Sequence, residues 1–397
     1  NKKTNLVNNI IYLWKYLGKQ RRLQFIFLLM LMIISGFAEV ISIGAVVPFL
    51  SALTNPEFLM KLDWFQPVIN ILDIKASNEL LLPLTLGFSG ASIIAGGLRI
   101  LLLWVNTKLS ASMGIQLRSE VYMRTLYQPY EFHVTHNSSQ LISMVTEKVG
   151  QAIQAGVMHV LMLVGAFITS LAIIATLVFI NPIVAVLTFF ILGGGYILIG
   201  YLVRKQIKFN GDIVAKNQPD AVKCMQEGLG GIRDIIMDNT QQIFIQLYTK
   251  VASNIQLAGM RNSFLGGLPK SLLEVLSIIL IAGLAYYLQT GENKEQQVLP
   301  ILGALALGAQ RLLPALQQIY FSWSFMNSYQ TILSEVTTQL KQSLPQSIAD
   351  KKNSHPLNFN YNIALEDLEF HYQNSEASVL KNINLTKEEI EAKANEY

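Results

Sequence analysis

A run of 55 residues without an Asp, Glu, Lys or Arg occupies positions 149–203 and reads VGQAIQAGVMHVLMLVGAFITSLAIIATLVFINPIVAVLTFFILGGGYILIGYLV. One helix needs only about 20 apolar residues to cross a bilayer, so this run is too long for a single span. Asn181 and Pro182 divide it, because Asn caps helices well and Pro suits the first helical turn. The run therefore predicts two membrane helices, at about 155–180 and 183–203.

The composition of the whole chain supports a membrane protein. Of the 397 residues, 51% are hydrophobic and 14% are charged, whereas soluble domains carry about 25% charged residues. This argues against a secreted domain, a disordered chain and a typical soluble enzyme. Cys224 is the only cysteine, which excludes an internal disulfide and a cysteine metal cluster. A net charge of +4 is too small to suggest a nucleic-acid partner.

Four further apolar runs predict four more membrane helices. They lie at about 23–53, 80–105, 270–290 and 297–326. The first run has no small-residue cleavage site, so it does not resemble a removable signal peptide. Together with the two helices above, these runs predict a multi-pass protein with six membrane helices.

The positions of Lys and Arg predict the orientation of the chain. The segments rich in these residues are 1–22, 108–124, 204–223 and the part beyond 340, and the other loops are poor in them. Since basic segments remain in the cytoplasm, we expect both termini there. The predicted location is the plasma (inner) membrane of a bacterium.

The two long basic connections predict structure of their own. About 50 residues separate the second helix from the third, and more than 60 separate the fourth from the fifth. Apolar and charged residues alternate in them as in amphipathic helices, and unstructured loops of this length are uncommon. The membrane helices are therefore expected to continue into the cytoplasm as two hairpins, with turns near 128–137 and 228–239.

The composition changes after residue 343. Residues 344–362 have the character of a linker, and 363–372 and 379–385 alternate apolar and polar residues as strands do. The predicted domains are a cytoplasmic N-terminal segment (1–22), an all-α membrane domain (23–343), the linker, and the start of a β-containing soluble domain (363–397).

This order of elements resembles an ABC exporter whose transmembrane half comes first, followed by an α/β nucleotide-binding domain. The segments that carry the resemblance are QPYEFH (128–133), NSSQLIS (137–143), GLGGIRDI (228–235), FHY (370–372) and VLKNINL (379–385). Three other segments are similar to the subgroup that includes lipid-linked oligosaccharide flippases: FAEVISIG (37–44), VPFL (47–50) and RLLP (311–314). These segments are spread along the sequence, and the resemblance extends over essentially the whole chain.

The resemblance implies roles for particular residues. The first coupling helix would contain Tyr130, Glu131, Phe132 and His133, and the second would contain Ile232, Arg233 and Asp234. Tyr372 matches the A-loop aromatic residue that stacks on adenine in this family. Because such transporters use two copies of each half, the resemblance also implies a homodimer.

The end of the chain departs from the family pattern. A glycine-rich phosphate loop should begin roughly 25 residues after the A-loop aromatic residue, but the chain ends 25 residues after Tyr372. Residues 387–397 contain no glycine. We therefore expect a fragment, a truncated product or an unusual half-transporter. ATP and Mg²⁺ would belong to the complete protein, and this chain alone is not expected to bind them securely or to hydrolyse ATP.

Four charged residues lie in or at the predicted membrane helices: Glu39, Arg99, Glu274 and Arg311. A charge at the bilayer centre costs about 2.5–3.5 kcal/mol on insertion scales, so such groups face protein or water. One interpretation is that they line a substrate cavity, where the arginines bind an anionic head group such as a pyrophosphate. The other is structural, with Glu39 or Glu274 pairing with an arginine and fixing the helix packing. His133, His136 and His159 lack the spacing of a metal site.

The sequence leaves three functions open. The first is an ATP-driven exporter or flippase for an amphiphile with an anionic head, such as a lipid-linked saccharide. The second is an exporter of peptides, drugs or lipids. An arginine-lined cavity would favour a phosphorylated head, whereas an apolar, aromatic cavity would favour drugs. The third is a membrane interaction protein without a motor. In each case the bilayer is a partner.

Overall fold

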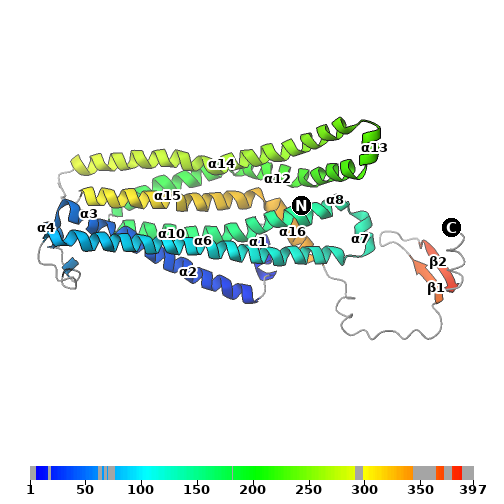
Figure 1. The fold of residues 1–397 in the computed structure, drawn as a ribbon, viewed down its shortest axis with the longest axis horizontal. Helices are drawn as coiled ribbons and strands as arrows, with labels where there is room; N and C mark the ends of the chain where they lie inside the picture. Colours follow the sequence, from blue (N-terminus) through cyan, green and yellow to red (C-terminus); the bar gives the residue numbers. More distant parts are fainter. Residues whose placement is uncertain are drawn as a thin grey trace. The chain divides into compact units, whose positions relative to one another are not determined.

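The computed structural model describes residues 6–16, 19–60, 65–66, 69, 77–180, 182–290, 298–342, 364–370 and 378–386. It divides into two units, Asn1–Leu344 and Pro345–Tyr397. In the first unit, the described elements are helices, and the long ones lie side by side in an elongated bundle (Figure 1).

The first half of the bundle runs from the N-terminal helix to the first hairpin and back. Its elements are α1 (Leu6–Tyr16), α2 (Lys19–Gly44), α3 (Val46–Thr54), α4 (Pro56–Met60), the 3₁₀ helix η2 (Ser77–Leu80), α6 (Leu81–Leu126), α7 (Tyr130–Thr135), α8 (Ser138–Ser143), the π-helix η3 (Met144–Lys148), α9 (Val149–Ile153), the π-helix η4 (Gln154–Met158) and α10 (His159–Ile180).

The second half begins after Asn181. Its elements are α11 (Pro182–Thr188), the π-helix η5 (Phe189–Gly193), α12 (Gly194–Gly230), α13 (Ile232–Met237), α14 (Gln241–Thr290), α15 (Val298–Ser328) and α16 (Gln330–Lys341). The predicted division of the charge-free run is confirmed, since one helix ends at Ile180 and the next begins at Pro182.

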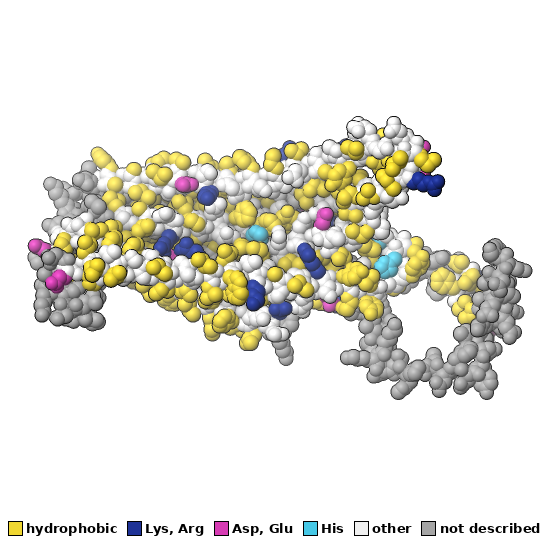
Figure 2. Space-filling view, viewed as in Figure 1, with side chains coloured by type: hydrophobic (Ala, Val, Ile, Leu, Met, Phe, Trp, Pro, Cys, Tyr) yellow, Lys and Arg dark blue, Asp and Glu magenta, His cyan; other side chains and the backbone are white. Residues whose placement is uncertain are grey.

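Five described stretches are long and apolar enough to cross a membrane: Leu23–Thr54, Leu81–Leu126, Ser138–Ile180, Ala185–Gly230 and Gln241–Gly283. Apolar side chains cover much of the visible face of the bundle, as a lipid-facing surface requires (Figure 2). A multi-pass membrane protein is therefore confirmed. The sixth expected helix is present as α15, but it is not among these five stretches, so a sixth crossing stays a prediction.

Both expected hairpins are continuous extensions of membrane helices. Helix α6 has 46 residues and leads to the short helix α7, while α12 and α14 have 37 and 50 residues and are joined through α13. Figure 1 shows α7 and α13 at the tips of the two hairpins. The short helices occupy the positions at which the sequence placed the turns.

A network of polar side chains joins α12, α14 and α15. Asn210 donates to Asn262 (2.8 Å), and Asn262 donates to the Ser328 hydroxyl (2.6 Å) and to the Ile207 carbonyl (3.1 Å). Gly211 lies beside this network, and a Cβ atom at that position would come within 1.8 Å of the Ser328 carbonyl oxygen. The absence of a side chain at Gly211 therefore allows the backbones of α12 and α15 to approach.

We expect Gly211→Ala to destabilise the bundle, because the added methyl group meets a backbone atom that cannot rotate away. Overpacking of this kind costs about 1–3 kcal/mol. Gly259→Ala is the matched control, since Gly259 lies within α14 with open space where its Cβ would be, and alanine favours a helix by about 0.5–1 kcal/mol over glycine. Thermal unfolding in detergent should show a lower midpoint for Gly211→Ala only. Equal midpoints for the two variants would contradict the close approach.

A second polar cluster fixes α1 and the end of α16 to α6. Tyr16 donates to the carboxylate of Glu120 and accepts from Arg124 Nη2 (2.7 Å), and Arg124 also donates to the Gln342 carbonyl. Burial, and then the hydrogen bond to Glu120, raise the pKa of Tyr16 to about 12. The phenol is therefore protonated at neutral pH and remains a donor.

The second unit contains an antiparallel pair of strands, β1 (Ala364–Phe370) and β2 (Leu380–Thr386). Leu365 pairs with Leu385, and Phe370 pairs with Leu380, with irregularities between them. Asp367 and Asn382 have φ values of 49° at these irregularities, a region in which Asp and Asn are enriched. The two predicted strands are confirmed, whereas their assignment to a nucleotide-binding domain stays a prediction.

Candidate functional site

Three of the four predicted intramembrane charges meet in one cluster, which we call the Glu39 triad. Glu39 lies on α2, Arg99 on α6 and Arg311 on α15. One carboxylate oxygen of Glu39 accepts from Arg99 Nη2 and the other accepts from Arg311 Nη1. The carboxylate thus connects three helices that are far apart in the sequence.

The charges of the triad do not cancel. Two guanidinium groups share one carboxylate, which leaves a net charge of +1 beside apolar helices. The side chain of Glu39 is 2% exposed, that of Arg311 is 22% exposed, and that of Arg99 is 61% exposed. Since guanidinium carries five donors, Arg99 keeps donors that are not bound to Glu39.

Glu274 lies apart from the triad. It is on α14, its side chain is exposed, and within the described part of the chain its carboxylate forms no ion pair. The structural interpretation of the intramembrane charges therefore has direct support, because Glu39 pairs with both Arg99 and Arg311. The pairing does not exclude a ligand, because a positive charge remains after it.

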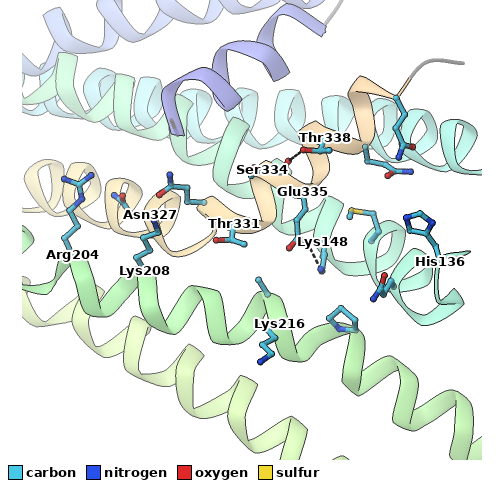
Figure 3. Close-up of a pocket in the computed structure, with 17 residues that line it drawn as sticks. His136, Lys148, Arg204, Lys208, Lys216, Asn327, Thr331, Ser334, Glu335 and Thr338 are labelled. Atoms are coloured by element: carbon cyan, nitrogen blue, oxygen red, sulfur yellow. Dashed lines mark hydrogen bonds and ion pairs between the residues drawn. The ribbon is translucent and has the colours of Figure 1, made fainter. Parts of the chain in front are cut away.

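A large polar cavity lies between α12 on one side and α15, α16 and the region of α8 and η3 on the other (Figure 3). Its volume is about 1150 Å³. The lining residues are mostly polar: His136, Gln140, Met144, Lys148, Arg204, Lys208, Ala215, Lys216, Pro219, Asn327, Gln330, Thr331, Ser334, Glu335, Thr338, Gln339 and Gln342.

We call this cavity the basic cavity, because the charge of its lining residues is positive. Lys148 Nζ lies 2.6 Å from Glu335 Oε2, so the ammonium of Lys148 neutralises the carboxylate of Glu335. Glu335 is the one acidic residue among those that line the cavity. Arg204 and Lys208 extend from α12 toward α15 and α16 (Figure 3). Neither forms an ion pair with any of the residues that the structure describes. Their charges are therefore available to an anion.

The sequence did not single out the cations of this cavity, although it contained a signal for two of them. Lys148 and Arg204 are the charged residues that immediately flank the charge-free run 149–203. Both line the cavity. Because the chain crosses the membrane within the run and then returns, its two ends lie at a similar depth.

The residues expected in coupling helices are all on the two hairpin-tip helices. Tyr130, Glu131, Phe132 and His133 belong to α7, and Ile232, Arg233 and Asp234 belong to α13. Tyr130 is 83% exposed and Ile232 is 45% exposed, so both tips present apolar groups. Tyr372, expected to stack on adenine, lies outside the described residues.

Comparison with known families identifies the class of this bundle. The family model described as the ABC transporter transmembrane region matches residues 25–297, which is more than half of the chain. No curated protein matches the chain significantly.

Proposed function

Because the chain belongs to the ABC transporter transmembrane region family, we propose that it is the membrane half of an ATP-driven exporter or flippase for an amphiphile with an anionic head group. The observation that supports this substrate class is positive charge that the described carboxylates do not neutralise, a net charge of +1 in the Glu39 triad and the cations Arg204 and Lys208 in the basic cavity. Phosphate and pyrophosphate groups fit such sites, because arginine binds their oxygens with two parallel hydrogen bonds.

A lipid-linked saccharide is one amphiphile of this kind. Its pyrophosphate would bind the cations, while its hydrocarbon chain would remain among the apolar helices. The polar, cationic lining of the basic cavity supports this substrate over an apolar drug, which would need aromatic and aliphatic walls. Export of peptides or of other lipids remains the second candidate within the family.

The motor would act through the hairpin tips. In this proposal, α7 and α13 are the coupling helices, and their exposed apolar groups contact the nucleotide-binding domain. Tyr372 would stack on adenine, and ATP with Mg²⁺ would be bound by the complete domain. The working unit would be a homodimer with six crossings per copy, in the inner membrane of a bacterium, with both termini in the cytoplasm. The alternative is a membrane interaction protein that has no ATP-driven motor.

Binding of polyprenyl pyrophosphate to the purified chain, compared with the uncharged polyprenol, tests the substrate class. We expect wild-type protein to prefer the pyrophosphate by at least about tenfold, because a hydrogen bond to a charged group contributes about 1.5–3 kcal/mol. Arg204→Gln/Lys208→Gln should reduce that preference by about tenfold or more. Lys205→Gln is the matched control, since Lys205 is an exposed cation on α12 that does not line the cavity.

Two outcomes would contradict the proposal. Equal affinity for the two lipids would show that the protein does not recognise an anionic head group. An unchanged preference in the Arg204→Gln/Lys208→Gln variant would show that the basic cavity does not bind that group. The ATP-driven step needs a separate measurement, in a protein with a complete nucleotide-binding domain. There, polyprenyl pyrophosphate should stimulate ATP hydrolysis, and absence of any hydrolysis would favour the role without a motor.

A further inference from the structure

A second concave site, which we call the α2–α6 groove, lies apart from the Glu39 triad and the basic cavity. Its volume is about 640 Å³, within the range of small-ligand sites. The lining residues all belong to α2 and α6: Arg21, Leu23, Gln24, Ile26, Phe27, Met30, Trp104, Val105, Lys108, Leu109 and Ser112. Several apolar ones are strongly exposed, among them Leu23, Phe27, Met30 and Trp104, so the groove opens on the surface of the bundle.

The groove has a polar end and an apolar end. Helices α2 and α6 run antiparallel, because Arg21 bonds to Ser112 while Glu39, further along α2, bonds to Arg99, earlier in α6. Arg21, Gln24, Lys108 and Ser112 therefore gather at one end, and Phe27, Met30 and Trp104 lie toward the other.

The length of the groove matches one leaflet of a bilayer. Met30 lies nine positions after Arg21 on α2, which corresponds to roughly 13.5 Å at a rise of 1.5 Å per residue. Half of the hydrocarbon core is about 15 Å thick. A ligand with its polar group at Arg21 would therefore extend an apolar chain to about the depth of Met30 and toward the middle of the membrane.

The polar end carries two cations and, among the residues that line the groove, no carboxylate. Arg21 Nη1 donates to Ser112 Oγ and to Gln24 Oε1, both at 2.9 Å, which fixes the guanidinium at the mouth. The ammonium of Lys108 lies 4.7 Å from the centre of the Trp104 ring. Both cations are thus held by neutral groups, and their charges remain available.

We propose that the α2–α6 groove binds an anionic phospholipid of the leaflet in which α2 begins. Its phosphate lies between Arg21 and Lys108, and one acyl chain follows Phe27, Met30 and Trp104. Basic pockets between membrane helices bind anionic head groups in this way, and each cation near the surface contributes about 1 kcal/mol. The proposal is independent of the exported substrate, because the groove shares no residue with the triad or the basic cavity.

Native mass spectrometry of the delipidated, purified chain tests the proposal. Equal amounts of phosphatidylglycerol and phosphatidylcholine with identical acyl chains are added, and the first bound lipid is counted. A clear preference for phosphatidylglycerol is expected, and Lys108→Gln should reduce it by about fivefold, the factor that corresponds to one cation. Arg21→Gln/Lys108→Gln should bring the ratio near one, and Lys205→Gln, an exposed cation outside the groove, should leave it unchanged.

Three results would overturn the proposal. The first is equal binding of the two lipids by wild-type protein. The second is an unchanged preference in Lys108→Gln, a variant that should fold because the Lys108 side chain contacts the Trp104 ring and has no hydrogen bond to the described residues. The third is coverage of the groove by a second copy, which crosslinking of Phe27→Cys in a Cys224→Ser background would reveal. Inorganic phosphate should not displace the lipid, because it lacks the acyl chain that the apolar end binds.

Discussion

Glu39→Gln should leave little folded protein, because it removes the one carboxylate that two membrane arginines share. Glutamine keeps the size of the side chain but not its charge, so Arg99 and Arg311 would repel each other across a neutral amide. Breaking a buried ion pair by removal of one partner costs about 3–5 kcal/mol, and total stability of a protein is only about 5–15 kcal/mol. The measurement is the yield of monodisperse protein and its thermal midpoint in detergent.

Two further variants separate this explanation from a general effect of losing an acid. Glu274→Gln is the matched control, since that carboxylate is exposed and forms no ion pair within the described residues. It should have a wild-type midpoint. Glu39→Gln combined with Arg311→Gln should recover part of the loss, because one unpaired charge is then removed. Wild-type stability of the single Glu39→Gln variant would contradict a structural role for the triad.

Much of the bundle was predictable from local patterns. The charge-free run 149–203, the start of a helix at Pro182, and the amphipathic extensions of the long hairpins depend on neighbouring residues only. The strands β1 and β2 were predictable for the same reason. Local periodicity identifies elements, and it identifies them best where they are long.

The triad was only partly predictable. Hydropathy singled out Glu39, Arg99 and Arg311 as costly charges, but which of them meet depends on the depth and rotation of three helices. The π-helical segments η3, η4 and η5 lie outside these three helices, and they make the faces of α9, α10 and α12 hard to predict, because an extra residue in a turn rotates the face that follows. No hydrophobic pattern in the sequence predicts those segments.

The remaining prediction concerns Arg99, the more exposed of the two arginines in the Glu39 triad. Arg311 is 22% exposed and Arg99 is 61% exposed, although both bind the same carboxylate. Burial makes Arg311 the partner that Glu39 needs for folding, whereas the exposed donors of Arg99 can reach an anion. If the proposed substrate is correct, Arg99→Gln should fold and should bind polyprenyl pyrophosphate at least about tenfold more weakly than wild type, as the loss of a hydrogen bond to a charged group implies.

Comparison of the two arginines makes the test decisive. Arg99→Lys should recover only part of the affinity, because an ammonium keeps the charge but loses the paired donors of guanidinium. Arg311→Gln should instead lower the thermal midpoint, since it breaks the more buried pair. Affinity is measured on folded protein only, so that a stability defect is not read as a binding defect. Wild-type affinity in a well-folded Arg99→Gln variant would show that Glu39 satisfies both arginines, and the anionic head group would then have to bind in the basic cavity alone.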